Sequence, residues 1–476
     1  MTQAIEAQES QDSPEDQVVS GFAEFAAAIT PNDVDDAAYR AAKRCLLDAL
    51  GCAISAYDFP PVRALRSVAT MVSSTRSATL IGTRVRTSPD LAAFVNGGMI
   101  RCLDFNDDYF GSEHTNARGD TGPHPSDNIG GVLAAAQVAG ADGTATLLGI
   151  VVAYEVCGQL VDEVVMRATG WDHPIFHSIA TSAAAGHLLG LPADRVADAV
   201  RLAVVPNLCV YETRVGAISN WKGLAGPNGS RNGMFATLLA EAGITGPRLA
   251  FEGPRGFMAQ IGHRFALGPF GGAGHPFRIE NTYFKQFALR YEMQLPVQLA
   301  FDLRQEVDPS EIRSLRVYME KKSVTTRAHE PALWRPQNRE TADHSGPYLI
   351  GAALLDGTVS EESFGEQRLC DPALLALVDT VELREDPDYT AAFPWRMSCR
   401  LEAELADGRT VIRTGDRPKG HPGDPFTDDE ITAKFLAQAV PRLGADRAEQ
   451  LARTVWHLEE EPDLNRLFDL LVVPTS

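Results

Sequence analysis

Residues 101–130 read RCLDFNDDYFGSEHTNARGDTGPHPSDNIG, a polar, glycine-rich stretch between two apolar runs. The run before it, residues 88–100 (SPDLAAFVNGGMI), and the run after it, residues 128–139 (NIGGVLAAAQVA), have the composition of buried helices. The stretch between them carries clustered carboxylates and two imidazoles: Asp104, Asp107, Asp108, Glu113, His114, Asp120 and His124. Long loops inside a compact domain are usually functional. The sequence therefore predicts two buried helices joined by a functional loop.

Composition alone leaves other interpretations of this loop open. A solvated acidic loop on the surface would have the same residues. A metal site is a weaker alternative, because the carboxylates stand close together and the imidazoles far apart, which is not a recognised ligand spacing. We therefore expect no metal ion here. Asp104 and Asp107 are candidate partners that orient one ring nitrogen of His124 and raise its pKa, and Ser126 is a candidate N-cap of the following helix.

The amino-acid sequence of the loop resembles that of the MmgE/PrpD family, and within it most closely that of the 2-methylcitrate dehydratases. LDFNDD at residues 103–108 and HPSDN at residues 124–128 carry the resemblance, the second at every position. The family usually has Thr at position 108, where this chain has Asp108. The resemblance implies an all-α body, a smaller lid domain, an active site between them, and a homodimer formed through the body.

Length and charge set limits on the class of protein. A chain of 476 residues with 44% apolar residues is expected to form two domains. The net charge of −20 argues against nucleic acid and anionic membrane surfaces as partners, because both attract basic surfaces. A small anionic substrate would need a local group of cations.

The seven cysteines are odd in number and contain no CxxC pair. A disulfide scaffold, a cysteine-bound zinc site and an iron–sulfur cluster are therefore not expected. No nucleotide-binding motif of the GxGxxG or GxxxxGK[ST] type and no GxSxG motif occurs. We expect a cofactor-independent protein in a reducing compartment.

Residues 1–17 are acidic and lack Lys and Arg over the first sixteen positions, which is typical of a disordered tail rather than a targeting signal. No uninterrupted apolar run of ~18 residues indicates a membrane span. A cytoplasmic location follows as an expectation.

The helical pattern along the chain predicts the domain layout. Residues 18–268 show apolar positions at helical spacing, and residues 416–476 return to that pattern. Residues 269–415 mix strands and helices, with a glycine-rich linker at 267–276 and a hairpin around the Asp407–Gly408 turn. The fold class is therefore mainly α, with a large helical domain built from both chain ends and a smaller α/β lid domain.

Four further segments carry candidate site residues, namely those around His173, Lys222 and Lys285, and residues 335–357. His173 precedes Pro174, which disfavours helix at the histidine, so His173 is expected to end a loop and His177 to pack. Lys222 stands before a glycine-rich helix start, and Lys285 lies in NTYFKQFALRYEMQLP, residues 281–296. As residues alone, the two histidines favour a structural role, whereas a solvated role and a binding role are equally open for each lysine.

The family resemblance gives these residues roles. Proton transfer is implied for Asp104, His124, His173 and Tyr348. Substrate binding is implied for Asp108, Lys222, Lys285, Arg339 and His344, the last two within RETADHS. Near Lys285 the family has a His, where this chain has Tyr291 or Glu292.

The resemblance implies a metal-independent lyase that removes water from 2-methylcitrate or a related tricarboxylate in propionate metabolism. A base would take the proton next to a carboxylate, cations would stabilise the enediolate, and an acid would protonate the leaving hydroxide. A decarboxylase or an epimerase of the same family is the alternative. A non-enzymatic helical oligomeric scaffold remains a third possibility.

Overall fold

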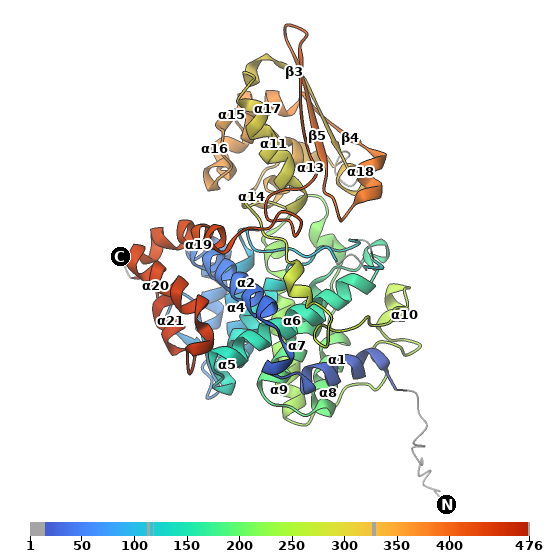
Figure 1. The fold of residues 1–476 in the computed structure, drawn as a ribbon, viewed down its shortest axis with the longest axis vertical. Helices are drawn as coiled ribbons and strands as arrows, with labels where there is room; N and C mark the ends of the chain where they lie inside the picture. Colours follow the sequence, from blue (N-terminus) through green and yellow to red (C-terminus); the bar gives the residue numbers. More distant parts are fainter. Residues whose placement is uncertain (1–14, 112–114, 118, 326–329, 475–476) are drawn as a thin grey trace, which may run out of the picture.

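The computed structural model describes residues 15–111, 115–117, 119–325 and 330–474. Helices from both chain ends pack into one body (Figure 1), which confirms the mainly α fold class. Its first part contains α1 (Gln17–Ala28), α2 (Asp36–Ser55), α3 (Pro60–Ala69), α4 (Pro89–Arg101), α5 (Ile129–Ala139), α6 (Gly143–Glu163), α7 (Pro174–Leu188), α8 (Ala193–Val204), α9 (Ala225–Glu241) and α10 (Phe257–Ile261). Its last part contains α19 (Asp428–Leu443), α20 (Ala445–Trp456) and α21 (Asn465–Leu471).

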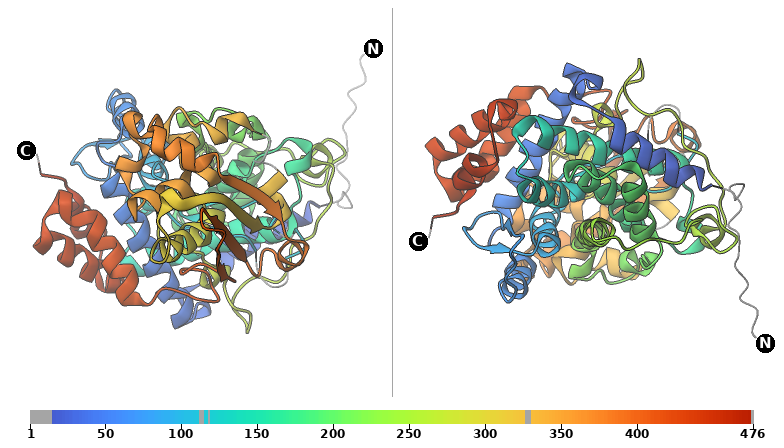
Figure 2. Two further views of the ribbon diagram at one scale, coloured as in Figure 1. Left: turned by 90° about the horizontal axis from the view of Figure 1, so that it is seen from above. Right: turned by 90° about the horizontal axis from the view of Figure 1, so that it is seen from below.

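The two ends of the chain meet in the body. Figure 2 shows the C-terminal helices beside the N-terminal ones, and α19 packs on α2. One hydrophobic cluster contains residues from Val18 to Phe284 and from Phe426 to Leu471. We call these residues the body.

Small residues let the central helices approach closely. A side chain at Gly229 or Gly233 of α9 would lie 2.2 or 2.3 Å from main-chain oxygens of α7. This contact explains why α9 is glycine-rich, and it fixes the helix starts that carry His173 and Lys222. Helix α6 is long and apolar enough to cross a membrane, but 89% of its most apolar window is buried inside the fold.

The smaller domain, residues 289–415, has its own core and is called the lid. Its sheet has the order β4–β3–β5–β6, where β3 (Ile312–Met319) pairs in parallel with β4 (Val381–Glu385) and antiparallel with β5 (Cys399–Leu405). Strand β6 (Thr410–Gly415) completes the predicted hairpin with β5. The helices are α11 (Gln294–Arg304), α12 (Lys321–Thr325), α13 (Pro331–Trp334), α14 (Arg339–Ala342), α15 (Gly346–Asp356), α16 (Glu366–Leu369), α17 (Pro372–Val378) and α18 (Pro387–Ala392).

The predicted linker at 267–276 is not the crossing between the domains. Phe270 stacks on Phe25 of α1 with ring centroids 4.3 Å apart, so this segment packs on the body. The chain crosses between Phe284 of the body core and Leu289 of the lid core. Glycine and proline mark irregular backbone in both places, and the aromatic side chains decide which surface it covers.

The expected acidic tail is interrupted at its end. Residues 1–14 lie outside the described residues. Asp16, however, is buried and caps α1 by accepting a hydrogen bond from the Val19 amide, and its other oxygen accepts from the Phe251 amide at 2.7 Å. The tail therefore does not extend to residue 17.

Candidate active site

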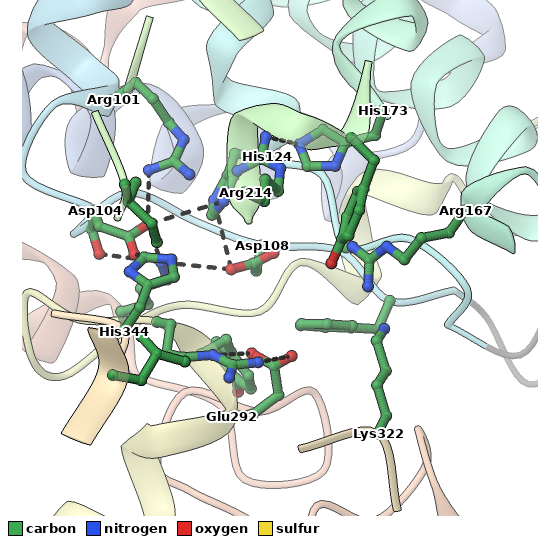
Figure 3. A pocket seen from close by; sticks show the side chains of 18 of the residues that line it. Arg101, Asp104, Asp108, His124, Arg167, His173, Arg214, Glu292, Lys322 and His344 are labelled. Atoms are coloured by element: carbon green, nitrogen blue, oxygen red, sulfur yellow. Dashed lines mark hydrogen bonds and ion pairs between the residues drawn. The ribbon is translucent and has the colours of Figure 1, made fainter. Parts of the chain in front are cut away.

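A pocket lies where the body meets the lid (Figure 3). It is lined from the body by Arg101, Asp104, Asp108, Phe110, Gly122, His124, Arg167, His173, Tyr211, Arg214, Ile218 and Lys285, and from the lid by Arg290, Tyr291, Glu292, Lys322, Glu330, Leu333 and His344. The acidic loop is therefore not a solvated surface loop, since Asp104, Asp107 and Asp108 are buried. It forms one wall of an interdomain pocket.

Asp104 stands at the centre of a group of cations. It follows α4 with a φ of 53°, a left-handed conformation that is uncommon outside glycine and typical of functional sites. Its carboxylate lies 2.6 Å from Arg101 Nη1, 2.9 Å from Lys285 Nζ and 3.1 Å from Lys222 Nζ. Burial alone would raise the pKa of Asp104, but these cations together hold it well below its usual range.

The two lysines predicted to hold a substrate carboxylate contact a carboxylate of the protein instead. Lys285 Nζ also donates to the Asp104 main-chain oxygen at 3.0 Å and is fully buried. Lys222 is absent from the pocket lining, and burial lowers its pKa to about 8 against the opposing effect of Asp104. Lys285 still lines the pocket, whereas Lys222 contacts Asp104 and its lid neighbours Asp343 and His344.

His124 presents one ring nitrogen to the pocket. Its Nδ1 lies 2.5 Å from the main-chain oxygen of Asp107, and its Nε2 lies on the pocket side, 3.9 Å from Asp104 Oδ1. Burial, reinforced by Arg101 and Lys285, holds the pKa of His124 well below its usual range. The expectation of a raised pKa is wrong, because a carbonyl rather than a carboxylate holds Nδ1 and cations surround the ring.

The Asp107 carboxylate holds the loop in place and forms no ion pair with the His124 ring. Its carboxylate accepts hydrogen bonds from Tyr154 Oη at 2.5 Å and from the Ser126 hydroxyl at 2.6 Å. Ser126 therefore does not cap α5 as predicted, because its side chain is committed to Asp107.

Asp108 is a buried carboxyl group with spare hydrogen-bonding capacity. Its main chain pairs with Tyr283 in both directions, at 2.8 and 3.0 Å, which fixes the side chain at the pocket wall. Oδ2 lies 3.4 Å from both His124 Nδ1 and Lys285 Nζ, and Oδ1 has no hydrogen-bond partner among the described residues. Burial raises the pKa of Asp108 well above its usual range, although Lys285 opposes this.

His173 ends a loop, as its sequence context predicts. It precedes α7, and its Nε2 lies 3.0 Å from Arg214 Nη2. Burial and then Arg214 hold the pKa of His173 well below its usual range. The ring lies 6.3 Å from that of His124, between centroids. His177 packs behind it, fully buried, which confirms that part of the prediction.

The lid contributes His344 opposite Asp104, with Nε2 3.7 Å from Asp104 Oδ2 (Figure 3). Its Nδ1 bonds Asp343. Ligand atoms of Asp104, Asp343 and His344 lie within 4.8 Å of one another, a spacing that could hold a metal ion. Lys222 Nζ lies beside all three, at 3.1 Å from Asp104, 3.9 Å from Asp343 and 3.4 Å from His344. An ammonium group so placed repels a metal cation.

Two predicted site residues lie away from the pocket. Tyr348 on α15 is buried in the lid core, and its hydroxyl donates to the Ser363 main-chain oxygen at 2.5 Å. The expectation that it faces the acidic loop is wrong, because this side of α15 faces the lid interior. Arg339 bonds Asp343 at 3.0 Å and Glu361 at 2.7 Å, so its charge is already paired. It holds Asp343 rather than the substrate.

Comparison with known proteins bears on both domains. The sequence pattern of the MmgE/PrpD N-terminal domain matches residues 20–268, and that of the MmgE/PrpD C-terminal domain matches residues 287–460. The chain belongs to the MmgE/PrpD family.

Relatives within the MmgE/PrpD family are named as two kinds of enzyme. A 2-methylcitrate dehydratase of Salmonella typhimurium is 28% identical, with 92% of this chain and 93% of that protein covered. A cis-aconitate decarboxylase of Mus musculus is 26% identical, with 96% and 94% covered. The mitochondrial 2-methylcitrate dehydratase of Yarrowia lipolytica is 26% identical over 83% and 78%. Both kinds of relative match nearly equally well.

Five cationic pocket residues of this MmgE/PrpD chain were not predicted from the sequence: Arg101, Arg167, Arg214, Arg290 and Lys322. Arg101 carried a usable signal, since it stands three positions before Asp104 at a helix end. The other four stand alone in the sequence and reach the pocket only through the fold. Tyr291, at the position where the family resemblance predicted His, also lines the pocket, and its hydroxyl has no partner in the described parts of the chain.

Proposed function

We propose that this protein is a lyase that removes water from 2-methylcitrate or a closely related tricarboxylate, giving 2-methyl-cis-aconitate or its analogue. The observation that carries the proposal is that His124 and Asp108 line one pocket 3.4 Å apart, between Nδ1 and Oδ2, where burial lowers the pKa of the imidazole and raises the pKa of the carboxyl group. A neutral imidazole can accept a proton and a neutral carboxyl group can donate one, which is the pair an elimination needs.

His124 is the proposed base. Its Nδ1–H donates a hydrogen bond to the Asp107 carbonyl oxygen. The lone pair of Nε2 can therefore accept a proton from a substrate in the pocket. This nitrogen takes the proton from the carbon that carries the methyl group and a carboxylate. The electron pair of that bond forms the new carbon–carbon double bond.

Asp108 is the proposed acid. As the carbon–oxygen bond breaks, the departing hydroxide takes the carboxyl proton and leaves as water. The imidazolium and the carboxylate then formed lie 3.4 Å apart, between His124 Nδ1 and Asp108 Oδ2. The charge separated during turnover is thus held within one pair, which stabilises it in a buried pocket.

Cations stabilise the negative charge that develops on the substrate carboxylate. Lys285 and Arg101 line the pocket on the same side as His124 and are held in place by Asp104. Such preorganised charges favour an enediolate more than the ground-state carboxylate. Lys222, Asp343 and Arg339 are assigned a positioning role through Asp104 and His344.

A decarboxylase is the second candidate, and the similarity to cis-aconitate decarboxylase favours it. The same cations would stabilise the carbanion left by carbon dioxide, and Asp108 would protonate it. The non-enzymatic scaffold explains neither the buried pair of His124 and Asp108 nor Asp108 Oδ1 and Tyr291 Oη, which have no hydrogen-bond partner among the described residues.

Proton NMR of purified protein with 2-methylcitrate, citrate and cis-aconitate in separate tubes distinguishes these candidates. The dehydratase proposal expects an unsaturated product from 2-methylcitrate and no carbon dioxide from any of the three. Release of carbon dioxide from cis-aconitate would identify the decarboxylase instead. No reaction with any substrate, by protein that melts cooperatively, would contradict both.

A further inference from the structure

Two cations face each other at the end of the pocket away from Asp104. Arg167 comes from the body, in a short 3-10 helix (Arg167–Thr169), and Lys322 comes from α12 of the lid. Figure 3 shows their charged ends pointing toward one another across the pocket. Both also line a depression on the outside of the molecule, together with Tyr211. They therefore stand at the passage between the pocket and solvent.

Neither cation forms an ion pair with a carboxylate of the described residues. In the described ranges no acidic oxygen lies within 4 Å of the Arg167 guanidinium or the Lys322 ammonium group. Lys322 Nζ donates to the main-chain oxygens of Gly119 at 2.5 Å and Asp120 at 3.4 Å. Arg167 packs over the Tyr211 ring at 4.9 Å. Like charges brought together without a counter-ion are unfavourable unless an anion joins them.

The acidic side chains near this pair are already engaged. Glu292 bonds Arg290, and Asp120 accepts hydrogen bonds from the main-chain amides of Met166 and Arg167 at 3.0 and 3.1 Å. Glu320 accepts from the Ser323 amide. Burial and then Arg167 lower the pKa of Lys322 to about 7. Glu292, Glu320 and Asp120 oppose this lowering of the Lys322 pKa, and a bound carboxylate would add to their effect.

A third cation, Arg290, lines the same pocket. Arg290 Nη1 is buried and has no hydrogen-bond partner among the residues that the structure covers, although Arg290 Nη2 is paired with Glu292. Buried donors without partners are rare in proteins. An anion in the pocket beside Arg290 would satisfy this one.

We propose that Arg167 and Lys322 form a binding site for the substrate carboxylate farthest from the reacting carbon. The proposal rests on the proposed function, and it adds to it the two residues that bind the third carboxylate of a tricarboxylate substrate. Guanidinium and ammonium groups both bind carboxylates through charge-assisted hydrogen bonds. Because one cation belongs to the body and the other to the lid, the bound carboxylate also joins the two domains over the substrate.

Calorimetric binding tests this site without turnover. The probes are tricarballylate, a tricarboxylate that lacks the hydroxyl group and cannot lose water, and succinate, which lacks the third carboxylate. The variants are Arg167→Gln and Lys322→Met, and Lys321→Met, at the exposed neighbouring lysine, is the matched control. Each pocket variant is expected to weaken tricarballylate binding about ten- to a hundredfold and to leave succinate binding unchanged. The control should bind both acids as wild type does.

The site is overturned if both variants bind tricarballylate with wild-type affinity, or if they lose both acids equally. Arg167→Gln changes a partly exposed side chain and is expected to fold. Its binding data therefore decide the test even if Lys322→Met does not fold. Turnover of 2-methylcitrate by the same wild-type preparation separates the two proposals. The expected binding pattern without turnover would retain the carboxylate site and refute the dehydratase. Turnover of 2-methylcitrate, together with variants that bind tricarballylate as wild type does, would retain the dehydratase and refute the carboxylate site. Wild-type protein that binds neither acid would also refute the site.

Discussion

Burial acts on Asp108 and His124 in opposite directions, because it disfavours the charged form of each group. It raises the pKa of the carboxyl group and lowers the pKa of the imidazole, and both shifts favour the uncharged form. Asp104, a few residues away and equally buried, stays ionised because Arg101, Lys222 and Lys285 surround it. Position within one short loop therefore gives neighbouring aspartates different chemistry.

Replacing Asp108 with Asn tests the proposed acid. Asn has the same shape and keeps a hydrogen-bond donor, but it cannot release a proton. We expect Asp108→Asn to lower kcat by about 10²-fold, with KM and the melting temperature near wild type. Steady-state kinetics with 2-methylcitrate and a thermal melt measure this. A variant that keeps wild-type kcat would show that Asp108 only binds substrate.

Asp127 offers a prediction about stability and pH. Burial raises its pKa to about 7, against the effect of Arg101, from an ordinary value of 3.8. The folded protein therefore binds a proton that the unfolded chain releases near pH 4, so this group's contribution to stability falls as pH rises from about 4 to 7. Asp127→Asn has no titrating group at this position, so it avoids this loss of stability at higher pH. We expect the melting temperature of the variant to exceed wild type by more at pH 8 than at pH 5; an equal difference at both pH values would contradict the raised pKa.

At the scale of elements, helices and strands follow from periodicity, but the direction of a side chain on a helix often does not. The hairpin at Asp407–Gly408, the helix ending at Gly357 and the loop position of His173 follow from local residues. His344 and Tyr348 lie four residues apart in one phrase. His344 stands before α15 and faces the pocket, whereas Tyr348 lies inside the lid. Only packing against the rest of the lid decides between these two faces.

Long-range pairing was equally inaccessible from the sequence. The contact of Lys285 with Asp104 joins positions 181 residues apart, and that of Lys222 with Asp104 joins positions 118 apart. The sequence could mark both lysines as site residues through the family resemblance. It could not show that both lysines form ion pairs with a carboxylate of the protein, Asp104.

Two tyrosines provide a matched test of these element positions. Tyr348→Phe removes a hydrogen bond inside the lid, so we expect it to lower the free energy of unfolding by about 1 kcal/mol and to leave kcat/KM unchanged. Tyr291→Phe removes a pocket hydroxyl without a described partner, so we expect lower kcat/KM and unchanged stability. Denaturant melts and kinetics on both variants measure this. Loss of activity in folded Tyr348→Phe would return that residue to the active site.

At the scale of the whole molecule, the net charge of −20 contrasts with the cations gathered between body and lid. Residues from both domains are needed to surround the pocket, and the chain crosses between the domains close to Lys285. The MmgE/PrpD patterns match the two parts of the chain separately. A change in how the lid sits on the body would therefore alter the site without altering either core.

Turnover is expected to survive removal of divalent metal ions. The group formed by Asp104, Asp343 and His344 has suitable ligand atoms, but the Lys222 ammonium lies beside all three. Activity after dialysis against EDTA, compared with activity after adding Mg²⁺, Mn²⁺ or Zn²⁺, tests this. Loss of activity that a divalent ion restores would mean that Lys222 moves aside to admit a metal.

His124 carries the central claim, which is that this pocket abstracts a proton with a neutral imidazole. His187→Gln is the matched control, because that histidine lies outside the pocket and its Nδ1 also contacts a main-chain oxygen, at 2.8 Å from Ala26. A role for His124 in packing alone would make the two variants behave alike.

The most direct measurement is kcat for 2-methylcitrate in wild type, His124→Gln and His187→Gln, each with its melting temperature. We predict that His124→Gln lowers kcat by about 10²-fold or more while its melting temperature stays close to wild type, and that His187→Gln keeps wild-type kcat. A folded His124→Gln protein that retains most of its turnover would contradict the account and move the proton-transfer role to His173 or His344.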